Sequence, residues 1–338
     1  MYTKEIIKSV KDNRLVVSQT PLRISFLGGG SDIKEYYSVH GGNVVSSTIK
    51  QYIYVNIQPN NKIFGDKFRI SYSQNEQVNH IDDIKNGIVR ESLRLLKIHT
   101  PLYISTSADL PARSGLGSSS SFAVGLLHAL HAFKDEEVTS EQLAEEACEV
   151  EIGLLRKSMG KQDQYAAAFG GLNKFSFNRD GSVEVKNLGD VSAYVEIFES
   201  LFLVWTAMLR DTETILSDQI AKTSENFNSL TKISAAASSL AHQIESRTLD
   251  PKSIGSMLLD SWNQKKSLSG KISNIEIDAL MDRCIKFGSS GGKLLGAGGG
   301  GFILVQVNDP LRFTEEFKEE TLIPVTADQF GSRIILKV

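Results

Sequence analysis

A segment rich in glycine and serine runs directly into an apolar helical pattern, and this junction restricts the fold more than any other part of the sequence. Residues 111–121 read Pro-Ala-Arg-Ser-Gly-Leu-Gly-Ser-Ser-Ser-Ser, and the pattern that follows predicts a helix over Ser121–Phe133. Gly115 and Gly117 permit a sharp turn and a close approach of the backbone to a ligand, and the free N–H groups at a helix start attract an anion. A flexible linker would not pass into a helix in this way. The segment therefore predicts a phosphate-binding loop, although no Lys follows Gly117 as a Walker A loop requires.

A second glycine cluster, Lys-Leu-Leu-Gly-Ala-Gly-Gly-Gly-Gly, ends at Gly301. Gly296, Gly298 and Gly301 match the spacing Gly-x-Gly-x-x-Gly, but a dinucleotide site needs a strand before the cluster and a helix after it. Here the order is reversed, because a predicted helix (Ile275–Phe287) precedes the cluster and a predicted strand (Phe302–Val307) follows it. Two explanations stay open: the glycines allow close approach to another chain segment or a ligand, or they form a tight hairpin.

A third cluster lies near the start of the chain, where a predicted strand (Arg23–Leu27) ends in three glycines followed by Ser31 and Asp32. Asp32 is either a ligand-binding carboxylate or the N-cap of a helical segment over 33–39. Arg23 is likewise either a functional cation or a solvated charge on the strand.

The three clusters, taken together and in this order, closely resemble the motifs of the GHMP kinase superfamily, named for galactokinase, homoserine kinase, mevalonate kinase and phosphomevalonate kinase. The resemblance spans roughly residues 18–310. The first cluster, Pro-Leu-Arg-Ile-Ser-Phe-Leu-Gly-Gly-Gly-Ser-Asp, is similar to that of the heptose 7-phosphate kinase branch. The Gly-Glu-His-Thr-Asp type of sequence that galactokinases carry there is absent.

The pattern of predicted elements is α+β, and 338 residues suggest two domains. The resemblance implies the two-domain GHMP kinase fold, with a ribosomal-S5-like N-terminal domain (1–190) that contains a left-handed crossover and a ferredoxin-like C-terminal domain (191–338). Strands are predicted over Arg23–Leu27, Asn43–Ser47, Gln51–Gln58, Phe68–Ser73, Leu102–Ser107, Leu201–Trp205, Phe302–Val307 and Arg333–Val338, with a hairpin within 171–190. Helices are predicted over Asp83–Leu96, Ser121–Phe133, Ser140–Met159, Thr212–Arg247, Asp250–Ser267 and Ile275–Phe287.

The resemblance implies that the cofactors are ATP and Mg²⁺. The residues that it assigns to ATP are Gly115, Leu116, Gly117, Ser118, Ser119 and Ser120, with Gly298 and Gly299 of the second cluster. It assigns the metal to Ser119 and to a Glu on the predicted helix Ser140–Met159. We expect Glu151, while Glu149 stays an alternative; at α-helical pitch the two point roughly 200° apart, so both cannot face the loop.

The resemblance also implies that Asp163, in Met-Gly-Lys-Gln-Asp-Gln-Tyr, orients or deprotonates the acceptor hydroxyl and that Arg23 lies beside it. A neighbouring cation would keep Asp163 ionised and offset charge in the transition state. The predicted sugar-binding residues are Gly29, Gly30, Ser31 and Asp32, with Lys161 and then Arg210 as cations for a remote phosphate. Other candidate cations are Arg113, Arg156 and Lys157.

The resemblance therefore implies an ATP-dependent sugar kinase that phosphorylates the anomeric hydroxyl of D-glycero-α-D-manno-heptose 7-phosphate to the 1,7-bisphosphate, for the synthesis of nucleotide-activated heptose. One alternative is a GHMP kinase for another acceptor, such as fucose or a mevalonate-like acid. The other is a catalytically inactive sugar or nucleotide sensor on the same fold. The simultaneous presence of Arg23, Ser119, Glu151 and Asp163 counts against the sensor.

Composition is consistent with a cytoplasmic enzyme whose partners are small molecules. The net charge of −3 and the lack of a basic, aromatic-rich patch argue against nucleic-acid binding. The longest strongly apolar run, Leu201–Leu209, is too short to span a membrane, and the N-terminus shows no signal-peptide core. Cys148 and Cys284 have no metal-binding spacing. The sequence leaves the oligomeric state open.

Overall fold

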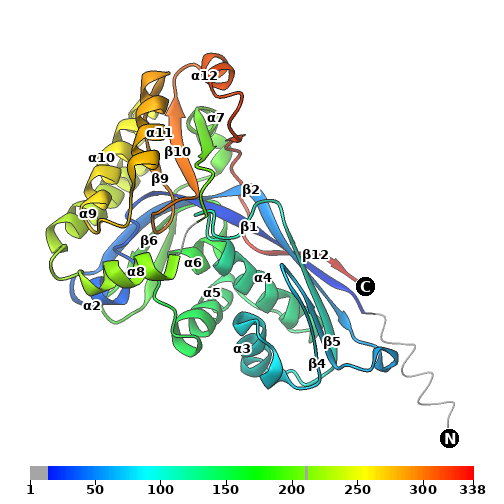
Figure 1. Cartoon of the computed structure of the whole chain (residues 1–338). Coiled ribbons are helices and arrows are strands. Elements are labelled where there is room, and N and C mark those ends of the chain that lie inside the picture. Colours follow the sequence, from blue (N-terminus) through cyan, green and yellow to red (C-terminus); the bar gives the residue numbers. More distant parts are fainter. Residues whose placement is uncertain (1–13, 210–211) are drawn as a thin grey trace, which may run out of the picture.

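The computed structural model describes residues 14–209 and 212–338, whose strands form two sheets (Figure 1). Sheet A has eight strands, in the order β12-β1-β2-β5-β3-β4, with β6 paired to β2 and β7 paired to β6. Its strands are β1 (Val16–Leu27), β2 (Gly42–Pro59), β3 (Phe68–Ser71), β4 (Asn75–Val78), β5 (Leu102–Ala108), β6 (Leu172–Phe177), β7 (Val183–Asn187) and β12 (Arg333–Lys337). Sheet B has the order β11-β8-β10-β9. Its strands are β8 (Leu201–Trp205), β9 (Ser289–Leu294), β10 (Phe302–Val307) and β11 (Leu322–Pro324).

Helices cover both sheets (Figure 1). The N-terminal helices are α2 (Lys34–His40), α3 (Gly87–Leu95), α4 (Ser118–Phe133), α5 (Ser140–Cys148) and α6 (Gln162–Phe169). The C-terminal helices are α7 (Val195–Glu199), α8 (Thr212–Ala221), α9 (Phe227–Glu245), α10 (Ile254–Lys266), α11 (Ile275–Lys286) and α12 (Pro310–Glu316). Short 3₁₀ helices lie at Lys62–Phe64, Ile81–Asp83, Val191–Tyr194 and Pro251–Ser253, and a π-helix at Glu149–Leu154. Helices α4 and α6 contact β1 and β2, α9 contacts β1, β2 and β6, and α10 contacts β9.

Strand β2 is long enough to carry two neighbours on one edge. Its first part pairs with β6 through Gly42–Ser47, and its second part pairs with β5 through Ile53–Pro59. The sequence predicted two separate strands here, but the structure continues the strand between them and takes up the change as a register shift against β1 after Pro21.

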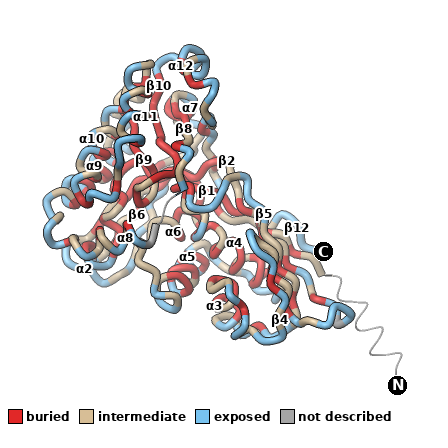
Figure 2. The backbone as a smooth tube through the Cα atoms, viewed as in Figure 1, coloured by how far each residue is buried: buried red, intermediate tan, exposed pale blue. Residues whose placement is uncertain are grey.

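One buried apolar cluster joins the two sheets. Leu22 and Ile24 of β1 belong to the same cluster as Ala241 of α9 and Leu304 of β10. Figure 2 shows buried segments in both sheets and in the helices that cover them. A second cluster lies between sheet B and the C-terminal helices, around Trp262 and Phe313. The last strand, β12, also returns to sheet A, where it pairs with β1. The boundary between 1–190 and 191–338 stays a prediction.

The structure confirms the α+β pattern and the hairpin within 171–190, which is the pair β6–β7. Besides the two strands that merge into β2, other element predictions differ from the structure. The helix predicted over Ser140–Met159 is α-helical only to Cys148 and ends as a π-helix at Leu154. The helix over Thr212–Arg247 is two helices, α8 and α9. Strand β9 was missed, because Ser-Ser-Gly-Gly-Lys-Leu contains none of the β-branched or aromatic residues that mark strands.

Both cysteines, Cys148 and Cys284, are buried free thiols. Within residues 14–209 and 212–338, no helix is long and apolar enough to cross a membrane.

Candidate active site

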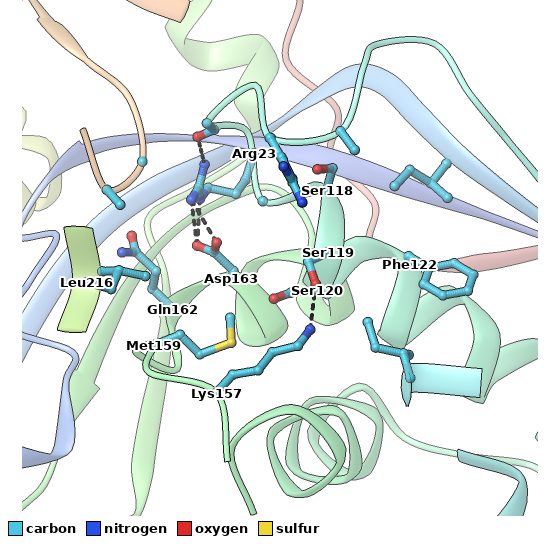
Figure 3. A pocket seen from close by; sticks show the side chains of 18 of the residues that line it. Arg23, Ser118, Ser119, Ser120, Phe122, Lys157, Met159, Gln162, Asp163 and Leu216 are labelled. Atoms are coloured by element: carbon cyan, nitrogen blue, oxygen red, sulfur yellow. Dashed lines mark hydrogen bonds and ion pairs between the residues drawn. The ribbon is translucent and has the colours of Figure 1, made fainter. Parts of the chain in front are cut away.

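A cavity of about 930 Å³ opens where the two sheets meet. Its walls come from the C-terminal part of β1, the loop before α4, the start of α6, and the turn between β9 and β10. Figure 3 shows Phe122 and Leu216 at its opposite ends, with Asp163 and Ser118–Ser120 between them.

The phosphate loop has the predicted geometry, but its helix starts earlier than predicted. Helix α4 begins at Ser118 instead of Ser121, and Gly117 is its N-cap with φ 79° and ψ 19°, a left-handed conformation that favours glycine. Among the described residues no side chain caps this helix start, so its N–H groups remain available to an anion. Ser118, Ser119 and Ser120 line the cavity, whereas Ser121 donates to Pro21 O.

The second glycine cluster supports this loop from behind. It connects the antiparallel strands β9 and β10, and Phe302 N donates to Ser114 O over 3.0 Å. A Cβ atom on Gly301 would lie 2.3 Å from Ser114 O, so only glycine fits. Both explanations left open by the sequence, a hairpin and a close approach to another segment, therefore apply together. Gly296 and Ala297 line the cavity.

Two predicted nucleotide ligands of this cluster, Gly298 and Gly299, do not line the cavity. Gly299 N donates to Ile272 O over 2.8 Å. Leu116 of the first loop does not line it either, because its side chain is fully buried and its carbonyl accepts from Arg23 N. Their contacts with a nucleotide stay predictions.

Arg23 and Asp163 form the pair that the resemblance implied (Figure 3). Arg23 Nε donates to Asp163 Oδ1 and Arg23 Nη2 donates to Asp163 Oδ2, each over 2.8 Å. The third guanidinium nitrogen, Nη1, donates to Gly115 O over 2.6 Å. The Arg23 side chain is only 3% exposed. A bidentate charge-assisted pair of this kind holds both groups in one orientation, directly beside the phosphate loop.

Glu151 lies on the other side of the loop and is fully buried. Its Oε1 accepts from Ser119 Oγ (2.6 Å) and Lys157 Nζ (2.9 Å), and its Oε2 accepts from Ser120 Oγ (2.7 Å) and Gln164 Nε2 (2.8 Å). Glu149 is exposed. The α-helical pitch used to separate the two acids does not apply, because both lie in the π-helix. The structure nevertheless turns Glu151 to the loop.

The oxygen atoms around Glu151 fit a magnesium ion. Mg²⁺ prefers carboxylate and hydroxyl oxygens and is held in kinases by one or two such ligands together with phosphate oxygens. Glu151 and Ser119 supply one of each beside the loop. Within the described parts of the chain, no group of three or more His, Cys, Asp or Glu residues could hold a metal by itself, so phosphate oxygens would have to complete the coordination.

The predicted sugar-binding residues divide into two sets. Gly30 and Asp32 line the cavity. Asp32 accepts from Gly30 N (2.9 Å) and Gln162 N (3.2 Å), and burial raises its pKa above the usual value against the opposing effect of these hydrogen bonds. Gly29 and Ser31 do not line the cavity. The Ser31 hydroxyl lies 2.8 Å from Gly28 O.

The cations predicted for the remote phosphate lie in different places. Lys161 donates to Gly181 O over 2.6 Å and lies above the Tyr37 ring, outside the cavity lining. Arg210 lies outside the described residues. Lys157, one of the other candidates, is bound to Glu151.

Sequence reasoning missed several polar residues of the site, among them Gln164, Gln219 and Lys265. Lys265 lines the cavity and donates to Gly296 O. The signal that could have revealed it is its position, because it falls on the buried stripe of α10 that includes Leu258 and Trp262. A charged residue on such a stripe requires an explanation.

Comparisons with known proteins agree with the motifs. The family model described as GHMP kinases N terminal domain matches residues 85–171, and the one described as GHMP kinases C terminal matches residues 240–314. The chain is 31% identical over 310 residues to D-glycero-alpha-D-manno-heptose 7-phosphate kinase of Campylobacter jejuni, covering 88% of this chain and 91% of that protein. It is 25% identical to L-fucokinase/L-fucose-1-P guanylyltransferase of Bacteroides fragilis, covering 89% of this chain and 35% of that longer protein.

Solved structures share the fold. A D-glycero-D-manno-heptose 1-phosphate kinase from Bacteroides thetaiotaomicron superposes with a TM-score of 0.76 at 24% identity, covering 95% of this chain and 99% of the other. The mevalonate kinase of Methanococcus jannaschii superposes with a TM-score of 0.69 at 19% identity, covering 95% and 98%. The predicted two-domain fold is thereby confirmed.

Proposed function

The chain belongs to the GHMP kinase family, and from this premise we propose that it phosphorylates the anomeric hydroxyl of D-glycero-α-D-manno-heptose 7-phosphate, with ATP as donor and Mg²⁺ as metal. The broader activity follows from the family: the protein is an ATP-dependent phosphotransferase acting on a sugar hydroxyl. The observation that carries the narrower proposal is the Arg23–Asp163 pair, which lines the same cavity as the phosphate loop, Asp32 and Lys265.

The nucleotide would lie along the loop side of the cavity. The N–H groups at the start of α4 and the hydroxyl of Ser118 would face the triphosphate, as a helix start favours bound phosphate. The hydroxyls of Ser119 and Ser120 hold Glu151 instead. The lining also includes the apolar residues Phe122, Ile53 and Ile88, which suit the flat face of an adenine. Bound Mg²⁺ would supply charge neutralisation on the phosphate oxygens.

The acceptor hydroxyl would lie against Asp163. As the sugar C1 oxygen forms a bond to the γ-phosphorus, the bond from that phosphorus to the bridging β–γ oxygen breaks and ADP leaves. The proton of the hydroxyl passes to a carboxylate oxygen of Asp163, which is held by Arg23 in the orientation that receives it. The guanidinium of Arg23 also offsets negative charge that develops on the transferred group.

The 7-phosphate of the substrate needs a cation at the far end of the part of the cavity that would hold the sugar, which we call the acceptor half. Lys265 is the cation that we propose for it, since its ammonium group lies in that half of the cavity beside Gly296. Lys161 remains the alternative, and it would have to exchange its contact with Gly181 O for the phosphate. Asp32, which lines the same cavity, would accept hydrogen bonds from the sugar hydroxyls.

The experiment is to incubate the protein with ATP, Mg²⁺ and a panel of sugars and sugar phosphates and to follow ADP release. Heptose 7-phosphate should give the highest kcat/KM, and free heptose, fucose and mevalonate should be much poorer. Equal turnover of free and phosphorylated heptose would refute the sugar-phosphate assignment but not the kinase activity.

Variants then assign the phosphate cation. Lys265→Ala should raise the KM for heptose 7-phosphate far more than the KM for ATP, because the remote phosphate supplies binding energy that positions the reacting hydroxyl. Lys161→Ala and Arg210→Ala test the two alternative cations. Lys266→Ala is the control, because the Lys266 ammonium lies near the Trp262 ring. If only Lys161→Ala has the effect, Lys161 holds the phosphate.

A further inference from the structure

The loop after the π-helix places Lys157 beside Glu151, the carboxylate that fits a magnesium ion. Lys157 N donates to Glu151 O over 3.0 Å, so the chain curls back within six residues. This brings Lys157 Nζ within 2.9 Å of Glu151 Oε1 and 3.1 Å of Ser119 Oγ. Figure 3 shows the Lys157 side chain extended across the cavity floor to Ser119. The ammonium therefore contacts the same two oxygens that fit a magnesium ion.

The carboxylate has no spare acceptor site. An ionised carboxylate offers about four lone-pair positions, and Glu151 accepts from four donors: two hydroxyls, one amide and one ammonium. A divalent cation at Oε1 must remove one of them. Ser120 and Gln164 bind the other oxygen, and Ser119 would itself become a metal ligand. Lys157 is the partner that repels the incoming cation.

Lys157 is also the partner that is able to leave. Its side chain is 35% exposed and lines the cavity, while Glu151 is 0% exposed. A lysine has a flexible four-carbon stem and three donors. Moving a few ångströms along the cavity would bring its ammonium to the phosphate oxygens of a nucleotide on the loop.

We propose that Lys157 is an exchangeable counter-ion: it neutralises the buried Glu151 carboxylate in the nucleotide-free protein, and it transfers to the nucleotide phosphates when a divalent cation takes its place. A buried carboxylate without a counter-charge is costly, so the lysine stabilises the nucleotide-free site until the metal arrives with the nucleotide. The inference does not depend on which sugar is the acceptor.

The proposal predicts opposite effects on two ligands. Lys157→Met keeps the stem and removes the charge, so Mn²⁺ should bind the nucleotide-free protein more tightly, on the order of 10-fold, the size typical of groups next to metal ligands. ATP without metal should bind more weakly, because the phosphates lose a cation. Arg156→Met is the matched control, since Arg156 is an exposed neighbouring cation outside the cavity lining; it should change neither.

The measurements are Mn²⁺ binding by electron paramagnetic resonance of the free ion and ATP binding by calorimetry in EDTA, both on the whole protein. Unchanged or weaker Mn²⁺ binding by Lys157→Met would overturn the proposal, as would unchanged ATP binding. If the Met variant does not fold, Lys157→Gln serves instead, because its amide can still donate to Glu151 without a charge. The same two results decide the outcome. Failure of the sugar assignment would leave both measurements unaffected.

Discussion

The two carboxylates that flank the phosphate loop are held in different ways. Asp163 is bound by two parallel hydrogen bonds from Arg23, whose third donor is fixed on Gly115 O. Glu151 is bound by two hydroxyls, an amide and the partly exposed ammonium of Lys157. Arg23, the partner of Asp163, is anchored by this further hydrogen bond, whereas Lys157, one partner of Glu151, is the group that we propose to exchange. In the proposed mechanism, the anchored Asp163 side is preorganised for proton removal, and the exchangeable Glu151 side replaces one cation by another.

Gly117→Val should have the largest effect, because it disturbs the loop beside the Arg23–Asp163 pair. A valine at φ 79° is strained, and a Cβ atom there would lie 3.2 Å from Arg23 Cγ and 3.5 Å from Asp163 Cγ. We expect nucleotide binding to fall below detection by calorimetry. Gly65→Val is the control, because Gly65 has φ 81° with no atom within 4 Å of an added Cβ. Nucleotide affinity that survives Gly117→Val would show that the loop has been assigned incorrectly.

Asp163→Asn should affect chemistry and spare nucleotide binding. The amide cannot take the hydroxyl proton, so kcat should fall by roughly 10²–10⁴-fold, the usual contribution of a general base. ATP affinity, measured by calorimetry, is the internal control and should stay within about 3-fold, since it depends on the loop. A variant with near wild-type turnover would remove Asp163 from the mechanism.

Gln164→Met should weaken metal binding at Glu151 and leave the Arg23–Asp163 pair intact. Gln164 is fully buried and donates to Glu151 Oε2 over 2.8 Å, so its loss removes a group that orients the metal ligand. We expect the Mg²⁺ concentration for half-maximal ADP release to rise by about 10-fold. Gln243→Met, on α9, is the control. If the Mg²⁺ requirement is unchanged, the orientation of Glu151 does not depend on Gln164.

The smallest effect should come from the far end of α4, where His131 lies between Glu136 (3.0 Å) and Glu146 (2.7 Å). Burial lowers its pKa, but the hydrogen bonds and charges of the two glutamates outweigh burial and raise the pKa above the usual value. Because the folded-state pKa is raised, the stabilisation is fully present below the unfolded value of about 6.5 and is lost as pH rises through the folded value.

His131→Gln should therefore lower the free energy of unfolding by on the order of 1 kcal/mol near pH 5.5, and by less as pH rises. His128→Gln is the control, because burial lowers the pKa of His128 to about 4 and keeps it neutral over this range. Thermal unfolding between about pH 5 and 8.5 measures both. A stability difference that grows with pH would contradict the charged state of His131. Neither variant should alter the Mg²⁺ requirement.

The backbone of the predicted phosphate loop could be inferred from the sequence because local chemistry determines it, whereas the acids opposite the loop were implied by the family resemblance. Gly117 needs a left-handed backbone, a helix pattern follows, and the family motifs implied that Arg23 and Asp163 lie together. These positions depend on residues that are near in sequence or on motif resemblance, so they were available before the structure.

The remaining features depend on tertiary packing. Nothing in Glu-Val-Glu-Ile-Gly-Leu indicates a π-helix, and only its geometry brings Lys157 back to Glu151. The pairing of β12 with β1 joins the two ends of the described chain. Strand β9 carries two glycines because two neighbours approach its backbone closely: a Cβ on Gly291 would lie 2.2 Å from Gly255 O of α10, and a Cβ on Gly292 would lie 2.5 Å from Leu304 O of β10. Such contacts have no local signature.

The central claim, that the anchored pair Arg23–Asp163 directs phosphoryl transfer to the anomeric hydroxyl of a sugar phosphate, is tested most directly by proton-coupled phosphorus NMR of the product. Phosphate on C1 couples to the anomeric proton alone and gives a doublet that correlates with this proton in a proton–phosphorus experiment, whereas the existing phosphate on C7 couples to two protons and gives a triplet. Incubation with heptose 7-phosphate, ATP and Mg²⁺ should add the doublet that correlates with the anomeric proton and retain the triplet, and Asp163→Asn should suppress this doublet. A new resonance that correlates with any other proton, or no new resonance with a folded, ATP-binding protein, would contradict the claim.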